Sequence, residues 1–437
     1  MASGENKKLN ILILSNSNPY KIAGFVSLDI LNGFRRIQGN KVKLIVRIWG
    51  NYKDKDIIPL QSFLGYKLNR IFRKIKNGFI RLKIIKDKIR NSNRDYSVQH
   101  YDQTKMLYST NEILNKIDFV PDAIFYLFPQ NFLTAKNLYE LNKITKAPIY
   151  WQLCDMSAFT GLCHYAWDCE GYKNRCGNCP AIYSKNEVDI SYSNLDFKKE
   201  YYSKTNLNVI VGSEWLINRA KQSYVLKDKK INKIYISSNE KMFYPIVDNT
   251  KLREKHKISS DTYVIGFGAN GLKARGKGIQ YILDAINLVK TERNILFIYA
   301  GGQVILKTFK HPTKYFGRLH RNELPDFYRL CNLWISASIQ DIGPAMIVEA
   351  LMCGLPVVSF DTGIANEFVK TNITGVLIAD FNVNALANGI NKMLKKSEEE
   401  INRIKINCYN ITKENLSLEK QINDYYSLFR EDGIITK

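Results

Sequence analysis

The chain has 437 residues, of which 45% are hydrophobic and 12% are aromatic, and its formal net charge is +23. This length predicts two domains, and the composition excludes a chain that is mainly disordered. No apolar run approaches the roughly 20 residues of a membrane-spanning helix, and the positive charge predicts attraction to polyanions or anionic lipid.

The first apolar run, LNILILS at residues 9–15, is too short for a secretory signal and predicts a strand. We therefore expect the chain to stay in the cytoplasm. Its eight cysteines should be mostly reduced there, so clustered cysteines indicate metal or redox chemistry rather than a disulfide framework.

Apolar, β-branched runs alternate with helical patterns along the chain. The predicted strands are Ile11–Leu14, Val42–Val46, Ala123–Leu127, Ile149–Leu153, Val209–Val211, Ile234–Ile236, Tyr263–Phe267, Ile295–Tyr299, Lys314–Phe316, Leu333–Ser336, Val357–Phe360 and Gly375–Ile378. Strands separated by helices predict an α/β fold with two doubly wound parallel sheets, and residues 239–257 are predicted to link them. Ligands bind at the carboxyl ends of such strands, so we expect the site in a cleft between the two domains.

The segment from Lys67 to Arg94 combines eleven basic residues and one aspartate with apolar residues at helical spacing. A basic amphipathic helix of this kind is typical of docking on anionic lipid. Two alternatives stay open: a solvated helix whose apolar stripe packs into the core, and a nucleic-acid-binding surface. No recognised nucleic-acid motif accompanies the segment, so we expect no nucleic-acid partner.

Four cysteines lie within 17 residues, at Cys163, Cys169, Cys176 and Cys179, with spacings C-x(5)-C-x(6)-C-x(2)-C. Four thiolates can bind structural zinc in a tetrahedral site, and the final pair has the spacing of a zinc knuckle. A disulfide between Cys176 and Cys179 and unligated thiols are the alternatives. We do not expect catalytic zinc here, because four thiolates leave no open position.

The segment IGFGANGLKARGKGIQYILDAI, which starts at Ile265, predicts a strand, a loop rich in glycine and basic residues, and a helix. Backbone N–H groups and the side chains of Arg275 and Lys277 could hold a phosphate there. A flexible, exposed basic turn is the alternative.

The most informative stretch is DIGPAMIVEALMCGLPVVSFDTGIANE, from Asp341 to Glu367. Pro344 suits the first position of a helix predicted over Ala345–Cys353, and Gly354 suits the position just past its end. Asp341 then lies in the loop before the helix and Glu349 inside it, separated by seven residues. The helix start, with Gly343 before it, can bind phosphate, and carboxylates can bind sugar hydroxyls.

This stretch resembles the signature of glycosyltransferase family 4, whose members are retaining enzymes of the GT-B fold. The resemblance implies that Glu349 binds the ribose, Asp341 contacts the transferred sugar in place of a glutamate, and Lys277 contacts the donor diphosphate. The family's arginine before that lysine is Leu272 here, so Arg275 is a substitute. Gly24, in the first loop, and Glu367 are further donor contacts that the resemblance implies, although Glu367 suits a helix cap equally well.

The cysteine-rich loop resembles a subgroup from bacterial surface-polysaccharide pathways, of colanic-acid, capsule or O-antigen type, that carries D-M-x-x-F-T-G-x-C-H-Y. Asp155, Thr160 and His164 belong to this motif here, which implies that they contact the acceptor or the reacting sugar. His164 could also be a metal ligand or a core residue. Cys154 stands where the subgroup has a histidine.

The resemblance implies transfer of a sugar, from a UDP-sugar rather than a GDP-sugar, to a lipid-linked or growing polysaccharide. We expect an acceptor domain over 1–240, a donor domain over 241–416 and a final helix over 417–437 that returns to the first domain. The cysteine loop covers 154–180 and the basic helix 67–94. No cofactor is required for catalysis, and the chain should work on the inner face of the cytoplasmic membrane. A non-catalytic sugar-nucleotide-binding subunit and a polyanion-binding protein are the alternatives.

Overall fold

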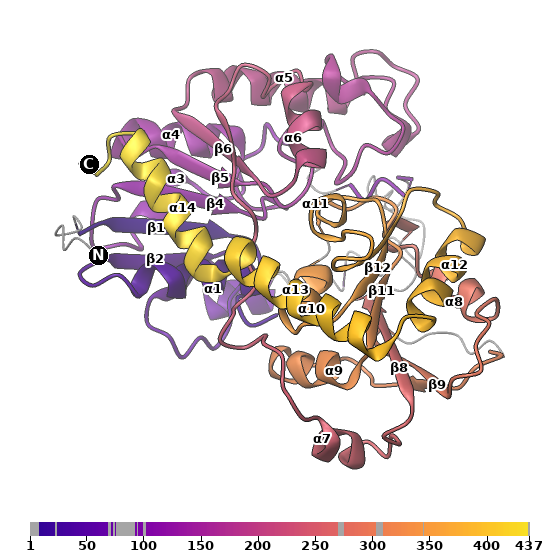
Figure 1. The fold of residues 1–437 in the computed structure, drawn as a ribbon. Coiled ribbons are helices and arrows are strands. Elements are labelled where there is room, and N and C mark those ends of the chain that lie inside the picture. Colours follow the sequence, from indigo (N-terminus) through magenta and orange to yellow (C-terminus); the bar gives the residue numbers. More distant parts are fainter. Residues whose placement is uncertain are drawn as a thin grey trace. The chain divides into compact units, whose positions relative to one another are not determined.

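The computed structural model describes residues 8–21, 24–68, 71–72, 75, 92–93, 95–98, 102–269, 275–302, 309–343 and 345–435. These residues form two compact units (Figure 1). Unit 1 takes its members from 1–212, 216–234 and 422–437, and unit 2 takes its members from 213–215 and 235–421. Among these residues no helix is both long and apolar enough to cross a bilayer.

Unit 1 is built on a parallel sheet of seven strands in the order β3-β2-β1-β4-β5-β6-β7. The strands are β1 (Asn10–Ser15), β2 (Lys41–Val46), β3 (Ile57–Pro59), β4 (Ala123–Leu127), β5 (Ile149–Gln152), β6 (Leu207–Val211) and β7 (Ile231–Lys233). The helices are α1 (Gly24–Arg35), α3 (Thr110–Leu114), α4 (Ala135–Thr145), α5 (Ile190–Ser203) and, apart from their first residues, α6 (Glu214–Lys221) and α14 (Leu418–Glu431). The strand order reverses between β1 and β4, so the loops after these strands flank a crevice at the sheet's carboxyl edge.

The end of the chain packs on unit 1. Phe34 of α1 stacks on Phe429 of α14 with ring centroids 6.0 Å apart, and Tyr425 donates a hydrogen bond of 2.8 Å to the buried Gln152 of β5. Figure 1 shows α14 in yellow beside α1 and the sheet. Buried aromatic contacts of this kind hold a helix on a sheet without a covalent link.

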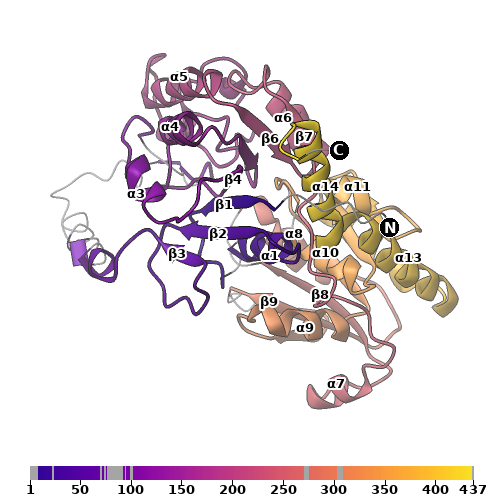
Figure 2. The same ribbon diagram turned by 90° about the vertical axis from the view of Figure 1, so that its left-hand side faces the viewer.

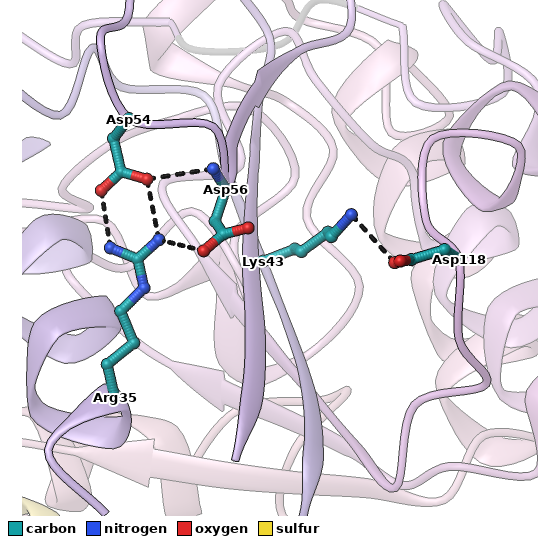
Figure 3. Close-up of polar contacts among 5 residues, drawn as sticks. All are labelled: Arg35, Lys43, Asp54, Asp56 and Asp118. Carbon is teal, nitrogen blue, oxygen red and sulfur yellow. Dashed lines mark hydrogen bonds and ion pairs between the residues drawn. The ribbon is translucent and has the colours of Figure 1, made fainter. Parts of the chain in front are cut away.

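A charged network ties α1 to the loop before β3 (Figure 3). Arg35 donates to both carboxylate oxygens of Asp54, at 2.6 and 2.8 Å, and to Asp56 at 2.6 Å. The hydrogen bond from Arg35 lowers the pKa of the Asp54 carboxyl below its ordinary value. A separate ion pair of 2.9 Å joins Lys43 of β2 to Asp118, which lies in the segment before β4. The network holds β3 at the edge of the sheet, next to β2 (Figure 2).

Unit 2 is built on a second parallel sheet, in the order β10-β9-β8-β11-β12-β13. Its strands are β8 (Tyr263–Ala269), β9 (Ile295–Gly301), β10 (Thr313–Tyr315), β11 (Leu333–Ser336), β12 (Val357–Phe360) and β13 (Gly375–Ile378). Its helices are α7 (Thr250–Lys255), α8 (Ile279–Ile286), α9 (Leu324–Leu330), α10 (Ala345–Met352), α11 (Ala365–Phe368), α12 (Val383–Leu394) and α13 (Glu398–Leu416). Because β8 leads outward to β9 and β11 leads outward to β12, right-handed crossovers place α8 and α10 on opposite faces.

The sequence predicted most strands at their observed positions, and Ala123–Leu127, Leu333–Ser336, Val357–Phe360 and Gly375–Ile378 agree at both ends. The prediction of a strand at Ile234–Ile236 was wrong. The observed β7 ends at Lys233, which pairs with Val211, the last residue of β6, so the chain beyond it has no partner strand. The short β3 was missed because it contains Pro59, which a sheet tolerates at its edge.

Candidate functional site

In unit 2, the loops that follow β8 and β11 are locked together. Residues Arg275–Lys277 form a single 3-10 turn before α8. The backbone N–H of Ile339 donates a hydrogen bond of 2.9 Å to the carbonyl of Gly276. Gly278 has φ +60°, and a Cβ on it would lie 1.7 Å from the carbonyl oxygen of Ala337. Only glycine allows the two loops to approach this closely.

This approach brings Lys277 to Asp341, and the two side chains form an ion pair. The Asp341 side chain is buried, whereas that of Lys277 stays 41% exposed. The second oxygen of Asp341 accepts a hydrogen bond of 3.2 Å from the N–H of Gly343. The two residues that the sequence assigned to the diphosphate and the sugar therefore meet at the switch point of the sheet, between β8 and β11.

Glu349 lies in α10, as predicted, and is half-buried. Its carboxylate accepts a hydrogen bond of 2.7 Å from the hydroxyl of Tyr328, a wholly buried residue of α9. Tyr328 was not predicted from the sequence. Burial, followed by the nearby Glu349 carboxylate, raises the pKa of the Tyr328 phenol well above its ordinary value, so it stays a donor.

Of the other residues predicted to contact the donor, some are exposed near the start of α8 or α10 and one lies outside the described residues. Ala345 is exposed at the start of α10, Arg275 is exposed, and Pro344 and Leu272 lie outside the described residues. Gly363, at φ +57°, packs closely against the backbone of Asp341, because a Cβ there would lie 2.5 Å from the Asp341 carbonyl oxygen.

The Glu367 carboxylate accepts hydrogen bonds within unit 2, from the Glu214 N–H at 2.9 Å and the Tyr235 hydroxyl at 2.7 Å. Both oxygens of its carboxylate therefore have partners in the chain itself. A donor contact for Glu367 stays a prediction.

In unit 1, Gly24 begins α1 directly after the loop that follows β1. A Cβ there would lie 1.8 Å from the carbonyl oxygen of Asn18, so the tight turn requires glycine. This packing requirement explains the residue without a ligand, and its predicted donor contact stays a prediction.

Asp155 and His164 face each other in the loop after β5. The Asp155 side chain is buried, and its Oδ2 lies 3.0 Å from Nδ1 of His164, an ion-pair distance outside hydrogen-bond geometry. Gln130 donates to the same oxygen at 2.8 Å. Burial alone would raise the pKa of Asp155, but the His164 ring and hydrogen bonds from Ser157 outweigh it and lower the pKa. Asp155 is therefore a buried carboxylate that faces the partly exposed His164 ring.

The loop that carries this pair is held by a lysine that the sequence analysis missed. Nζ of Lys198, buried in α5, donates to the carbonyl oxygens of Ser157 at 2.7 Å and Thr160 at 2.8 Å. Burial lowers the pKa of Lys198 to about 8. Lys198 follows the buried Asn194 at helical spacing, a signal that could have placed it on the inner face of α5. Thr160, in turn, donates its hydroxyl to the carbonyl of Cys163.

The four clustered cysteines line one small cavity of about 20 Å³, and all are free thiols. Burial raises the pKa of Cys163 and Cys179, and raises that of Cys176 to about 12, so these side chains stay protonated. Within the described residues, no group of three or more His, Cys, Asp or Glu side chains is placed to hold a metal ion. The thiols as they lie do not form a zinc site, and zinc binding stays a prediction.

Most of the basic segment 67–94 lies outside the described residues. Its described part begins in a helical turn over residues 63–68. Leu64 and Phe72 are each 65% exposed, and Ile71 and Ile75 are also exposed. These apolar side chains are thus not packed into the core.

Comparisons with known proteins bear on this geometry. Residues 248–410, which lie in unit 2, match the family model described as Glycosyl transferases group 1. The likeness to group 1 glycosyltransferases thus lies in unit 2. CapM of Staphylococcus aureus, a capsular polysaccharide biosynthesis glycosyltransferase, is 26% identical over 208 residues, which are 43% of this chain and 52% of CapM. The chain covers 52% to 67% of the lengths of the curated relatives it matches.

Solved structures agree over nearly the whole chain. Sucrose-phosphate synthase from Thermosynechococcus elongatus has a TM-score of 0.68 at 14% identity, over 98% of this chain and 99% of that one. HepE from Anabaena, solved in complex with UDP-glucose, has a TM-score of 0.59 at 17% identity, over 96% and 100%. With the two parallel sheets, these likenesses confirm the predicted GT-B fold.

The matched residues include Lys277, Asp341 and Glu349, and of these the fold pairs Lys277 with Asp341. Asp155, Thr160, His164 and the cysteines belong to unit 1, outside the matched residues. The subgroup assignment that rests on these unit 1 residues therefore stays a prediction.

Proposed function

We propose that the chain is a retaining glycosyltransferase that moves a sugar from a nucleotide donor to a lipid-linked or growing bacterial polysaccharide. The observation that carries this proposal is the pairing of Lys277 with Asp341 beside the start of α10, the helix that holds Glu349. A cation, two carboxylates and a helix start match the diphosphate, the sugar and the ribose of a sugar nucleotide.

The ion pair suggests how the site receives its donor. In the free protein, Asp341 offsets the charge of Lys277. A diphosphate carries more negative charge than one carboxylate, so Lys277 would turn to the donor and leave Asp341 to accept a hydroxyl of the sugar. Lys277, with Arg275 and the first N–H groups of α10, would then stabilise the leaving diphosphate. The leaving phosphate would help to take the acceptor's proton, so no separate enzymic base and no catalytic cofactor are needed.

A UDP-sugar is the donor we favour over a GDP-sugar. The solved complex of HepE with UDP-glucose supports this choice, because HepE shares the fold. The match to CapM supports a surface-polysaccharide acceptor. We assign binding of the acceptor to Asp155, Thr160 and His164. The acid–imidazole pair of Asp155 and His164, 3.0 Å apart, supports this assignment.

We place the protein on the inner face of the bacterial cytoplasmic membrane. The exposed apolar side chains at Leu64, Ile71, Phe72 and Ile75 support this, since a stripe packed into the core would be buried. The eleven basic residues from Lys67 to Arg94 would add attraction to anionic headgroups.

Structural zinc at the four cysteines is a separate proposal. The shared cavity supports it, although the thiols would have to close around the ion. Metal analysis of purified protein tests it: about one zinc per chain, lost together with stability on chelation, is expected. No bound metal, with the fold intact under chelation, would exclude it.

Donor screening tests the main proposal. Nucleotide sugars are compared for thermal stabilisation, and transfer to a lipid-linked acceptor is then assayed with the best donor. We expect one UDP-sugar to stabilise the protein and to be turned over, and Glu349→Ala and Lys277→Ala to lose turnover. Donor binding without turnover would favour the non-catalytic subunit, which the Asp341 and Cys154 departures also suggest. Both variants at full activity would overturn the assignment of the site.

A further inference from the structure

Unit 2 has a second candidate site on the edge of its sheet opposite to Lys277 and Asp341. A groove of about 640 Å³ is lined by residues of the segments that lead into three strands. Ile258 precedes β8, Asn332 precedes β11, and Leu355 precedes β12. We call it the strand-start groove. Its volume suits a small organic molecule rather than a single inorganic ion.

Among the residues that the structure describes, two of its cations, Arg253 and Lys405, form no ion pair with an acid, and Asp261 and Glu398 act on them through their charge alone. The guanidinium of Arg253 is buried and donates to the carbonyls of Ser259 at 3.0 Å and Thr262 at 2.9 Å, and to Oδ1 of Asn332 at 2.9 Å. Nζ of Lys405, from α13, forms no hydrogen bond or ion pair with any residue that the structure describes. Neutral acceptors satisfy the hydrogens of Arg253 but leave its charge uncompensated.

The remaining charges of the lining do not cancel this excess. Arg329 pairs with Asp326 at 3.2 Å, and Glu254 is exposed at the rim. Burial, followed by the nearby charge of Arg253, lowers the pKa of the Lys405 amine. An incoming anion would meet an amine with free hydrogens near the charge of Arg253, and its negative charge would favour the protonated amine.

Part of the lining is apolar. Ile246 is 38% exposed at the rim and Val247 is fully exposed, while Leu355 and the thiol of Cys353 are buried in the wall. These side chains give a ligand an apolar surface beside the cations. A molecule with an anionic head and a compact apolar part matches this combination.

The groove also reaches the helix of the proposed donor site. Tyr328 lines the groove and donates its hydroxyl to Glu349. Cys353, also in the lining, donates its N–H to the carbonyl of Glu349 at 3.1 Å. The wall of the groove therefore includes one residue bonded to the Glu349 side chain and one bonded to its backbone carbonyl.

We propose that the strand-start groove binds a small organic anion, bearing a phosphate or a carboxylate on an apolar body, and that its occupancy tightens α10. Lys405 makes the charged contact, and Tyr328 transmits the occupancy to Glu349. The consequence for donor affinity rests on the proposed function, whereas binding in the groove does not.

Calorimetric titration with phenyl phosphate, and with benzoate as the carboxylate counterpart, tests the binding at constant ionic strength. Loss of one charge-assisted contact in Lys405→Gln should weaken binding about tenfold or more. Lys413→Gln, the same change farther along α13, and Lys277→Ala, at the other edge of the sheet, should bind like the wild type. Equal affinity in the wild type and Lys405→Gln, or no binding of either anion, would overturn the proposal. A loss in Lys277→Ala alone would assign the binding to the donor site.

Hydrogen exchange of the α10 amides tests the transmission without any nucleotide. Phenyl phosphate should slow exchange over residues 345–352 in the wild type, and less so in Tyr328→Phe, which keeps the ring but loses the bond to Glu349. Equal protection in both proteins would overturn the role of Tyr328. A failure of the proposed function would instead show as absent turnover with groove binding intact.

Discussion

Lys277 forms an ion pair with the buried carboxylate of Asp341, a residue 64 positions later in the chain. The pair implies opposite effects of two substitutions on nucleotide binding. Lys277→Met removes the cation that would hold the diphosphate, so affinity for UDP should fall about tenfold or more. Asp341→Asn frees Lys277 from its internal partner, so affinity for UDP should be equal or higher while sugar transfer falls.

Calorimetry with UDP and a transfer assay check this pair of outcomes, with Lys290→Met, an exposed lysine of unit 2, as the control. If Asp341→Asn weakened UDP binding as much as Lys277→Met, Asp341 would itself contact the nucleotide. The proposal that Lys277 turns from Asp341 to the diphosphate would then be wrong.

Gly278 should be irreplaceable for the loop. Alanine there combines the strain of φ +60° with a clash at the carbonyl of Ala337, and we expect the free energy of unfolding to fall by about 2 kcal/mol or more. Gly317 is the matched control, since it has φ +74° but nothing within 4 Å of a built Cβ. Denaturant unfolding should show a loss of about 1 kcal/mol for Gly317→Ala. Equal losses in the two variants would mean that the loops separate without cost.

Glu349 should act through the ribose hydroxyls. In the wild type, UDP should bind more tightly than its 2′,3′-dideoxy analogue, by about tenfold, because a carboxylate accepts strong hydrogen bonds. In Glu349→Ala the two ligands should bind alike, since their difference measures that one interaction. A preference for UDP that survives the substitution would assign the ribose to other residues.

The buried Lys198 predicts a pH dependence of stability. Its pKa is about 8 in the folded chain and about 10.5 when unfolded, so the folded state loses the proton first. Its contribution to stability should therefore be lowest below pH 8 and should rise as the pH increases from about 8 to about 10.5, by up to about 3 kcal/mol.

Other groups also titrate in this range, so the readout is the difference between proteins. Denaturant unfolding of the wild type should gain stability with pH relative to Lys198→Met, which has no proton to lose. Lys199 is the next residue and forms a surface ion pair with Asp228, so Lys199→Met should show the same dependence on pH as the wild type. Parallel curves for the wild type and Lys198→Met would show that Lys198 keeps an ordinary pKa.

The exposed apolar residues at the start of the basic segment predict lipid binding. Leu64→Ser with Phe72→Ser should weaken sedimentation with anionic liposomes about tenfold or more, because each change removes a side chain that would enter the bilayer interface. Ile406→Ser, at a 60% exposed position of α13, controls for exposed apolar area as such. Unchanged binding of the double variant, or equal binding to neutral liposomes, would contradict the docking surface.

Several of these features follow from local chemistry and were visible in the sequence. A helix start after Asp341, a stop at Gly354 and a buried run at Val357–Phe360 depend on neighbouring residues, so the position of Glu349 within α10 could be derived. The parallel sheets followed in the same way from the alternation of strands and helices. The limits of strand pairing did not follow from the sequence. The last residue of β7 pairs with the last residue of β6, and no local sequence pattern predicts where that pairing stops.

The residues that hold the candidate site in place depend on contacts between distant parts of the chain. The bond from Tyr328 to Glu349, the grip of Lys198 on the cysteine-rich loop and the contact of Gly278 with Ala337 all join separate elements. The same holds for the strand-start groove, whose lining comes from residues before three strands and from α13. Propensity and capping act over a few neighbouring residues, so the amino-acid order was sufficient for most of the elements, for the fold class and for the places of Asp341 and Glu349 around the start of α10. Burial and charge pairing arise when the sheet brings remote loops together, so these partners emerged from the folded chain alone.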